Sequence, residues 1–135
     1  MNNNTDIEPC VDEIIKQVGK KLVVGLPLGL GKPAPLINAL YARAKKDTTL
    51  SLTICTALSL EIPAAKSELE RRFLEPFAKR YFDGVPELDY ARDRRAKKLP
   101  DNVEVIEFYF SPGALLGNEH AQQNYISSNY THAAR

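Results

Sequence analysis

The fold is decided by one stretch near the N-terminus, Leu22-Val23-Val24-Gly25-Leu26-Pro27-Leu28-Gly29-Leu30-Gly31-Lys32-Pro33. It begins as a short β-rich run and continues as a loop of glycines and prolines. Pro33 suits the first position of a helix, because its missing N–H would have no partner there. Apolar residues then recur at helical spacing from Leu36 to Ala44. Strand, glycine loop and helix in this order predict the opening of a βαβ unit.

The remaining chain continues the alternation of helix and strand. The patterns predict a leading helix over Ile7–Val18, a parallel strand over 50–56, a helix opened by the Ser67–Glu70 capping box, a charged helix over 86–98, and a strand over 103–110 with a turn at 111–113. Pro76 is expected to kink the helix that the capping box opens, or to end it near Glu75. The predicted fold class is α/β, an open and mostly parallel sheet with flanking helices, in which residues 1–20 form the leading helix and residues 21–135 the α/β domain.

Composition and charge exclude several classes of protein. The chain has 135 residues and a formal net charge of +1, so no global charge favours nucleic acid or an anionic membrane. The uncharged run Thr48–Leu60 spans 13 residues, fewer than the roughly 18–20 that a membrane helix needs. The N-terminus has neither a basic segment nor an apolar one of the kind found in a signal peptide. These features predict a cytoplasmic protein that binds neither nucleic acid nor membrane.

The glycine loop is the first candidate for a binding site. Glycines allow the backbone to approach a ligand, and the helix that follows attracts anions at its N-terminus. The spacing of Gly25, Gly29 and Gly31 is nevertheless neither that of a dinucleotide loop nor that of a Walker A loop. Two interpretations stay open at this point: a tight turn between strand and helix, or ligand contact through the backbone and Lys32.

The other reactive side chains form no recognisable constellation. His120 and His132 are the only histidines; a pair of His132 with Ser127 or Ser128 lacks the nucleophile-elbow sequence, and no metal-ligand spacing occurs. The basic run 92–98 is interpreted as a solvated helix face, with polyphosphate contact as the alternative. Cys10 and Cys55 are expected to be reduced, with Cys55 in the core.

Four further segments, together with the glycine loop, resemble the acetyl-CoA hydrolase/transferase family of CoA transferases. They are Leu52-Thr53-Ile54-Cys55-Thr56-Ala57-Leu58-Ser59-Leu60-Glu61, Leu69-Glu70-Arg71-Arg72-Phe73-Leu74-Glu75-Pro76-Phe77, Phe110-Ser111-Pro112-Gly113-Ala114-Leu115-Leu116-Gly117-Asn118, and Ala121 to Arg135. They follow the family order over nearly all of the chain after Leu22. The resemblance implies an enzyme that transfers CoA between an acyl group and a carboxylate, or hydrolyses acyl-CoA, through a glutamyl-CoA intermediate.

The resemblance also implies which residues meet the substrate. In the family the nucleophilic glutamate lies in the second half of the protein. The chain is therefore expected to be an incomplete, truncated first half that is inactive alone and has no catalytic residue, metal or cofactor of its own. Coenzyme A is expected as a substrate. By family position, the glycine loop and the segment before the C-terminus lie beside the cleft. The substrate-binding residues expected on this basis are Gly29, Gly31, Lys32, Asn129, Tyr130 and His132.

Two alternatives to an incomplete transferase remain. The first is a stand-alone α/β module that binds acyl-CoA or another anion, or that mediates an interaction. The second is a small sugar-phosphate isomerase, for which no acid–base pair is evident. A first half without its partner should expose apolar surface, so self-association or pairing with the missing half is expected.

Overall fold

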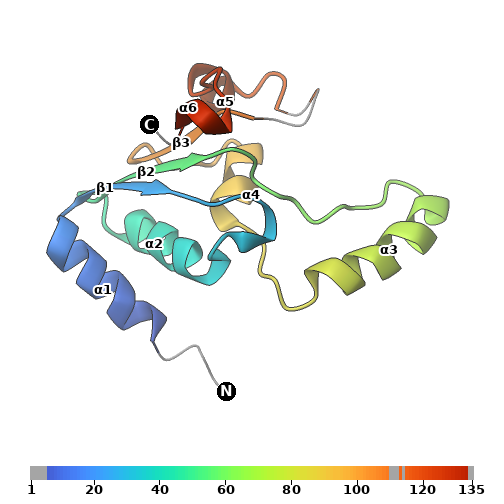
Figure 1. The fold of residues 1–135 in the computed structure, drawn as a ribbon, viewed down its shortest axis with the longest axis horizontal. Helices are drawn as coiled ribbons and strands as arrows, with labels where there is room; N and C mark the ends of the chain where they lie inside the picture. The colour runs from blue at the N-terminus through green and yellow to red at the C-terminus, as the bar shows by residue number, and fades with distance from the viewer. Residues whose placement is uncertain (1–5, 110–112, 114, 134–135) are drawn as a thin grey trace.

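The computed structural model describes residues 6–109, 113 and 115–133, and these form a three-stranded parallel sheet with flanking helices. The elements in chain order are α1 (Ile7–Val18), β1 (Lys21–Gly25), the 3₁₀ turn η1 (Gly29–Gly31), α2 (Ala34–Lys46), β2 (Ser51–Thr56), α3 (Glu68–Phe82), α4 (Asp89–Arg95), β3 (Val103–Glu107), α5 (Glu119–Gln123) and α6 (Tyr130–Ala133). The predicted α/β class and open parallel sheet are therefore confirmed (Figure 1).

The sheet has the strand order β1-β2-β3, and both pairs of neighbours are parallel. Alternate residues of each strand point to one face, where Leu22, Ile54 and Val105 are buried in a core with residues of α1, α2 and α4. On the opposite face Val23 remains 64% exposed, and Cys55 is half-buried. The expectation that Cys55 belongs to the core is wrong, because its strand position directs it away from the core face.

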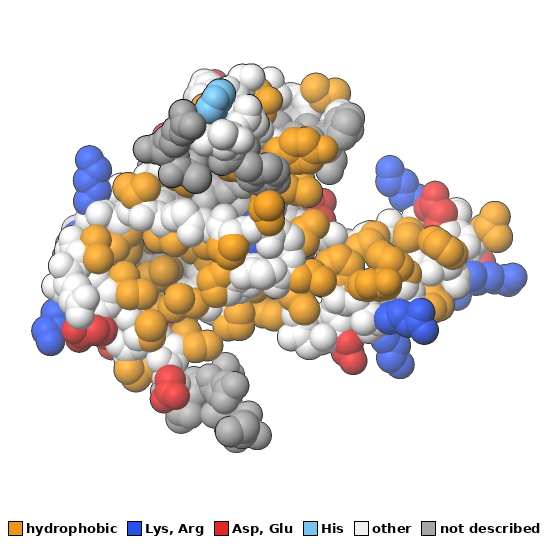
Figure 2. Space-filling view, viewed as in Figure 1, with side chains coloured by type: hydrophobic (Ala, Val, Ile, Leu, Met, Phe, Trp, Pro, Cys, Tyr) orange, Lys and Arg blue, Asp and Glu red, His pale blue; other side chains and the backbone are white. Residues whose placement is uncertain are grey.

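The predicted helix after the capping box is one continuous element. Ser67 Oγ accepts a hydrogen bond from the Glu70 amide at 3.2 Å, as the capping box predicts. Of the two outcomes expected at Pro76, a kink or an end near Glu75, the end is wrong, since α3 runs through Pro76 to Phe82. A proline inside a helix removes one backbone hydrogen bond, and the turns on either side of it retain theirs. No residue of α3 is buried, and Figures 1 and 2 show it standing apart from the sheet with apolar side chains on its surface.

The charged helix is shorter than predicted, because its first residues are held in an extended conformation. The Asn38 side chain donates to the Glu87 carbonyl at 2.8 Å and accepts from the Asp89 amide at 3.0 Å. Helix α4 therefore begins at Asp89, and Lys97, at a φ of 55°, follows its end.

Smaller differences concern Pro33 and the last strand. Pro33 is the N-cap of α2 and not its first residue, so the N1 prediction is wrong by one position. Strand β3 ends at Glu107, three residues earlier than predicted. Phe110 and two residues of the predicted turn, Ser111 and Pro112, lie outside the described residues.

Candidate functional site

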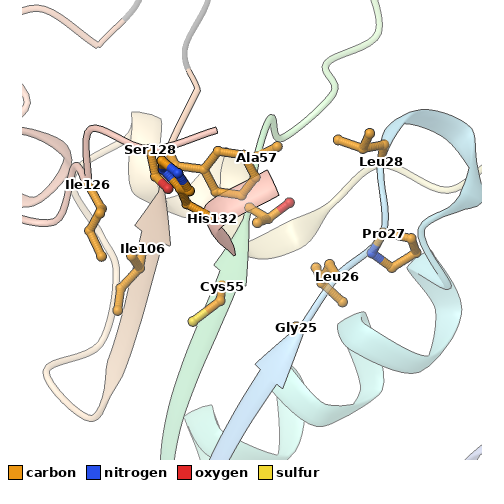
Figure 3. A pocket seen from close by; sticks show the side chains of 12 residues that line it. Gly25, Leu26, Pro27, Leu28, Cys55, Ala57, Ile106, Ile126, Ser128 and His132 are labelled. Carbon is orange, nitrogen blue, oxygen red and sulfur yellow. The ribbon is translucent and has the colours of Figure 1, made fainter. Parts of the chain in front are cut away.

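A cavity of about 520 Å³ lies where the three parallel strands end. Ligand sites in open α/β sheets occur at this carboxyl edge, and cavities of roughly 300–1,000 Å³ suit small ligands. Gly25 ends β1, Cys55 and Thr56 end β2, and Ile106 is near the end of β3. Figure 3 shows Gly25, Cys55 and Ile106 below Ser128 and His132, which come from the C-terminal segment and lie over the strand ends.

The lining of this cavity is largely apolar, with a few polar side chains. It comprises Gly25, Leu26, Pro27, Leu28, Cys55, Thr56, Ala57, Ile106, Phe108, Ile126, Ser128 and His132. None of these described lining residues is a carboxylate. Burial and the nearby Glu104 raise the pKa of the Cys55 thiol, which favours the poorly nucleophilic neutral form. The arrangement suits an apolar ligand group oriented by hydroxyl and imidazole groups.

Lys32 is buried directly behind one wall of the cavity. Its Nζ donates to the Pro27 carbonyl at 2.6 Å and to Thr56 Oγ1 at 2.7 Å, and both of these residues line the cavity. Burial lowers the pKa of Lys32, and the charge of Glu107 opposes that change in part. The ammonium thus ties the glycine loop to the end of β2. Because Thr56 Oγ1 accepts from Lys32, the Thr56 hydroxyl hydrogen remains as a donor for a neighbouring group.

A buried ion pair supports the edge of the sheet next to Lys32. Glu107 is 1% exposed in its side chain and lies 3.0 Å from the guanidinium of Arg94, which is 2% exposed. The Glu107 carboxylate also accepts from the Ser59 amide at 2.9 Å and from the Ser59 hydroxyl. The Ser59 hydroxyl lies 2.9 Å from that of Tyr90, whose pKa is raised by burial to about 12. These contacts make Glu107 a structural anion and not an open nucleophile.

The six residues expected to bind substrate do not all meet at this cavity. His132 lines it, whereas Gly29 and Lys32 line a different and smaller cavity of about 30 Å³. Gly31 is exposed. Asn129 Oδ1 accepts from the His132 amide at 3.2 Å and so stabilises the start of the turn that carries the imidazole. Tyr130 begins α6, and its side chain lies outside what the structure describes.

The other histidine has a structural role at the outer edge of β3. His120 Nε2 accepts a hydrogen bond from the Val105 amide at 3.1 Å. Burial and the nearby Arg94 charge lower the pKa of His120. Ser128 Oγ donates to the Asn129 carbonyl at 3.4 Å, so the described part of the chain holds no Ser–His hydrogen bond of a catalytic pair. Among the described residues no cluster of His, Cys, Asp and Glu could hold a metal ion.

The basic run on and after α4 is largely neutralised within the protein. Arg92 pairs with Asp89 at 2.7 Å, Arg94 with Glu107, and Arg95 with Glu61 and with Glu87. Lys97 and Lys98 are exposed. The solvated-face interpretation therefore holds for part of the run only, because Arg94 is buried.

Thr56, Ala57 and Ser128 line the cavity although none of them was among the six residues expected to bind substrate. The strand pattern carries a usable signal for Thr56, since a polar residue at the carboxyl end of a parallel strand faces the ligand edge. A second signal lies in the alternation Val103, Val105, Glu107, which places a carboxylate on the buried face of β3. A carboxylate at such a position requires a buried partner, here Arg94.

No helix in the described ranges is both long enough and apolar enough to cross a membrane. Comparison of the chain with protein-family models, with curated proteins and with solved structures finds no match.

Proposed function

We propose that this chain is the N-terminal part of an enzyme of the acetyl-CoA hydrolase/transferase kind, and that the cavity at the strand ends receives the acyl end of acyl-CoA. One observation carries the proposal. Three segments that resemble this family, far apart in the sequence, contribute to the lining of a single cavity: 22–33 through Gly25, 52–61 through Ala57, and 121–135 through His132. Convergence of separate motifs on one site is expected when they serve one ligand.

The chemistry of the lining fits the thioester end of such a substrate. The apolar walls suit a short acyl chain, and the Thr56 and Ser128 hydroxyls and the His132 imidazole can donate to a carbonyl oxygen. Glutamyl-CoA chemistry requires a carboxylate nucleophile. Because no described lining residue is a carboxylate and Glu107 is held by Arg94 and Ser59, we expect this chain to bind acyl-CoA without turning it over.

The test is calorimetric titration with acetyl-CoA and with CoA, combined with an acetyl-CoA turnover assay on the same sample. Cys55→Phe should fill the cavity and weaken acetyl-CoA binding at least about ten-fold. Val23→Phe is the matched control, because Val23 faces the same side of the sheet but lies outside the lining. Failure of the native chain to bind acetyl-CoA, or equal losses in both variants, would refute the proposed site.

A stand-alone anion-binding module is the second candidate, favoured by the exposed Lys97 and Lys98 beyond α4. Such a module would recognise the phosphates that CoA and acetyl-CoA share, and would bind both with equal affinity. The acyl cavity predicts tighter binding of acetyl-CoA than of CoA, and loss of this preference in Cys55→Phe. Turnover by the isolated chain would contradict the argument that the nucleophile lies elsewhere.

A further inference from the structure

Helix α3 carries a continuous apolar ridge that no other part of the described structure buries. Leu69 is 79% exposed, Phe73 74%, Phe77 39% and Tyr81 54%. These residues follow each other at steps of four, which places them along one ridge of the helix surface. The rings of Phe77 and Tyr81 lie 4.7 Å apart, so the ridge is already packed along its own length.

The side of α3 away from the ridge carries ion pairs within the helix. Arg71 lies 2.9 Å from Glu68 and 3.2 Å from Glu75, and these residues are on the side of the helix away from the ridge. Segment 57–67 joins this helix to β2 and segment 83–88 joins it to α4, and the helix stands apart from the sheet (Figure 1). An amphipathic helix with a satisfied polar face and an open apolar ridge is suited to pack against another helix.

We propose that the ridge packs against the same ridge of a second copy of this chain, with the two α3 helices antiparallel about a two-fold axis at Glu75. The four ridge residues are spaced evenly about this point, so each one faces another ridge residue when the helices are antiparallel. Leu69 lies level with the partner's Tyr81, and Phe73 lies level with the partner's Phe77. A two-fold interface requires such a surface, because the same patch must serve both copies.

Charge supports the antiparallel orientation over the parallel one. The first turn of α3 is acidic, with Glu68 and Glu70, and the last turn is basic, with Lys79 and Arg80. Antiparallel pairing brings the acidic turn of each copy to the basic turn of the other, whereas parallel pairing juxtaposes like charges. Opposed helix dipoles add to the same preference.

The size of the ridge sets the expected affinity. Large aromatic side chains bury about 150–250 Å² each, so partial burial of four side chains in each copy gives an interface of roughly 1,000 Å² in total. This is the lower end of the range for specific association. We therefore expect a reversible dimer with a dissociation constant in the micromolar range.

Sedimentation velocity of the full chain over a concentration series up to about 100 µM tests the proposal. Phe73→Asp should raise the dissociation constant at least about ten-fold without loss of helical circular dichroism, because Phe73 is mostly exposed in the single copy. Val23→Asp is the matched control on the exposed sheet face and should leave the dimer intact. A native chain that stays monomeric, an undisturbed Phe73→Asp dimer, or dissociation by Val23→Asp would each overturn the proposal.

A second pair of variants tests the orientation. Arg80→Glu places two negative charges at the same level in the antiparallel dimer, the new glutamate and Glu70 of the other copy. It should weaken the dimer several-fold more than Arg72→Glu does, since Arg72 lies on the side of the helix away from the ridge. Equal effects of these two substitutions, or a stronger effect of Arg72→Glu, would refute the antiparallel arrangement.

Discussion

Replacing Glu107 by Gln should destabilise this protein more than any surface charge substitution. Gln preserves the size of the side chain and an acceptor for Ser59, but it removes the negative charge that lies 3.0 Å from the Arg94 guanidinium, which is 2% exposed. Breaking a buried pair in this way typically costs about 3–5 kcal/mol. A domain of this size has a total stability of roughly 5–15 kcal/mol, so the expected fall in melting temperature is on the order of 10–20 °C.

The assay is urea unfolding followed by far-ultraviolet circular dichroism, with a double-mutant cycle. Combining Glu107→Gln with Arg94→Met removes both charges, so the double variant should lose less stability than the sum of the single ones, by about 2 kcal/mol or more. Asp12→Asn provides the control, because Asp12 forms an exposed pair with Arg43 at 2.7 Å and should contribute less than about 1 kcal/mol. Additive losses in the cycle, or a cost for Glu107→Gln below about 1 kcal/mol, would refute the structural role assigned to the buried pair.

Three further perturbations have defined outcomes. The pKa of His120 is lower in the folded state than its ordinary value of 6.5, so the unfolded chain takes up a proton first as the pH falls through that value. The free energy of unfolding should therefore decrease as the pH falls, and His120→Gln should reduce this pH dependence in urea titrations. Gly29→Ala should lower the free energy of unfolding by about 1–2 kcal/mol in thermal unfolding, because Gly29 has a φ of 55°. Gly31→Ala should leave it unchanged, because Gly31 has no positive φ and an added Cβ there would contact no neighbour. Ser67→Ala should cost α3 about 1 kcal/mol, seen as faster amide exchange in its first turn, because the Glu70 amide loses its acceptor.

Each of these outcomes has a result that would contradict it. An unchanged pH profile in His120→Gln would show that another group titrates between the folded and unfolded states. Equal costs for the two glycine substitutions would show that the positive φ of Gly29 is not what limits replacement. Faster exchange throughout the sheet in Ser67→Ala would show that α3 unfolds together with the core, contrary to its lack of buried residues.

Local patterns predicted most elements because they depend on neighbours in the chain. The apolar spacing in 7–18 and the capping box at Ser67 each describe one helix, and the structure confirms both. The length of the charged helix was predicted wrongly because a distant residue intervenes. Asn38, about fifty positions away in the chain, holds residues 87–89 extended and shortens the charged helix. Periodicity within a segment contains no information about such a contact.

The candidate site shows the same difference between what local patterns predict and what distant contacts decide. The rule for parallel sheets made ligand contact one of the two interpretations of the glycine loop that the sequence left open. The sequence could not show that Lys32 turns inward to Thr56, because that contact depends on how the loop packs against β2. Nor could it separate His132, which lines the cavity, from Gly29, which faces a smaller one.

By itself, the sequence determined the class of the fold, the succession of its three strands and of helices α1 to α4 along the chain, and the motifs that resemble a CoA-transferase family. Hydrophobic period, capping and turn chemistry act over a few residues, so they can be read without coordinates. Tertiary structure alone decided that Glu107 is paired and buried, that three separate segments share one cavity, and that the ridge of α3 remains exposed. These properties arise from contacts between residues far apart in the chain, and the free energy of such contacts depends on burial that no local pattern specifies.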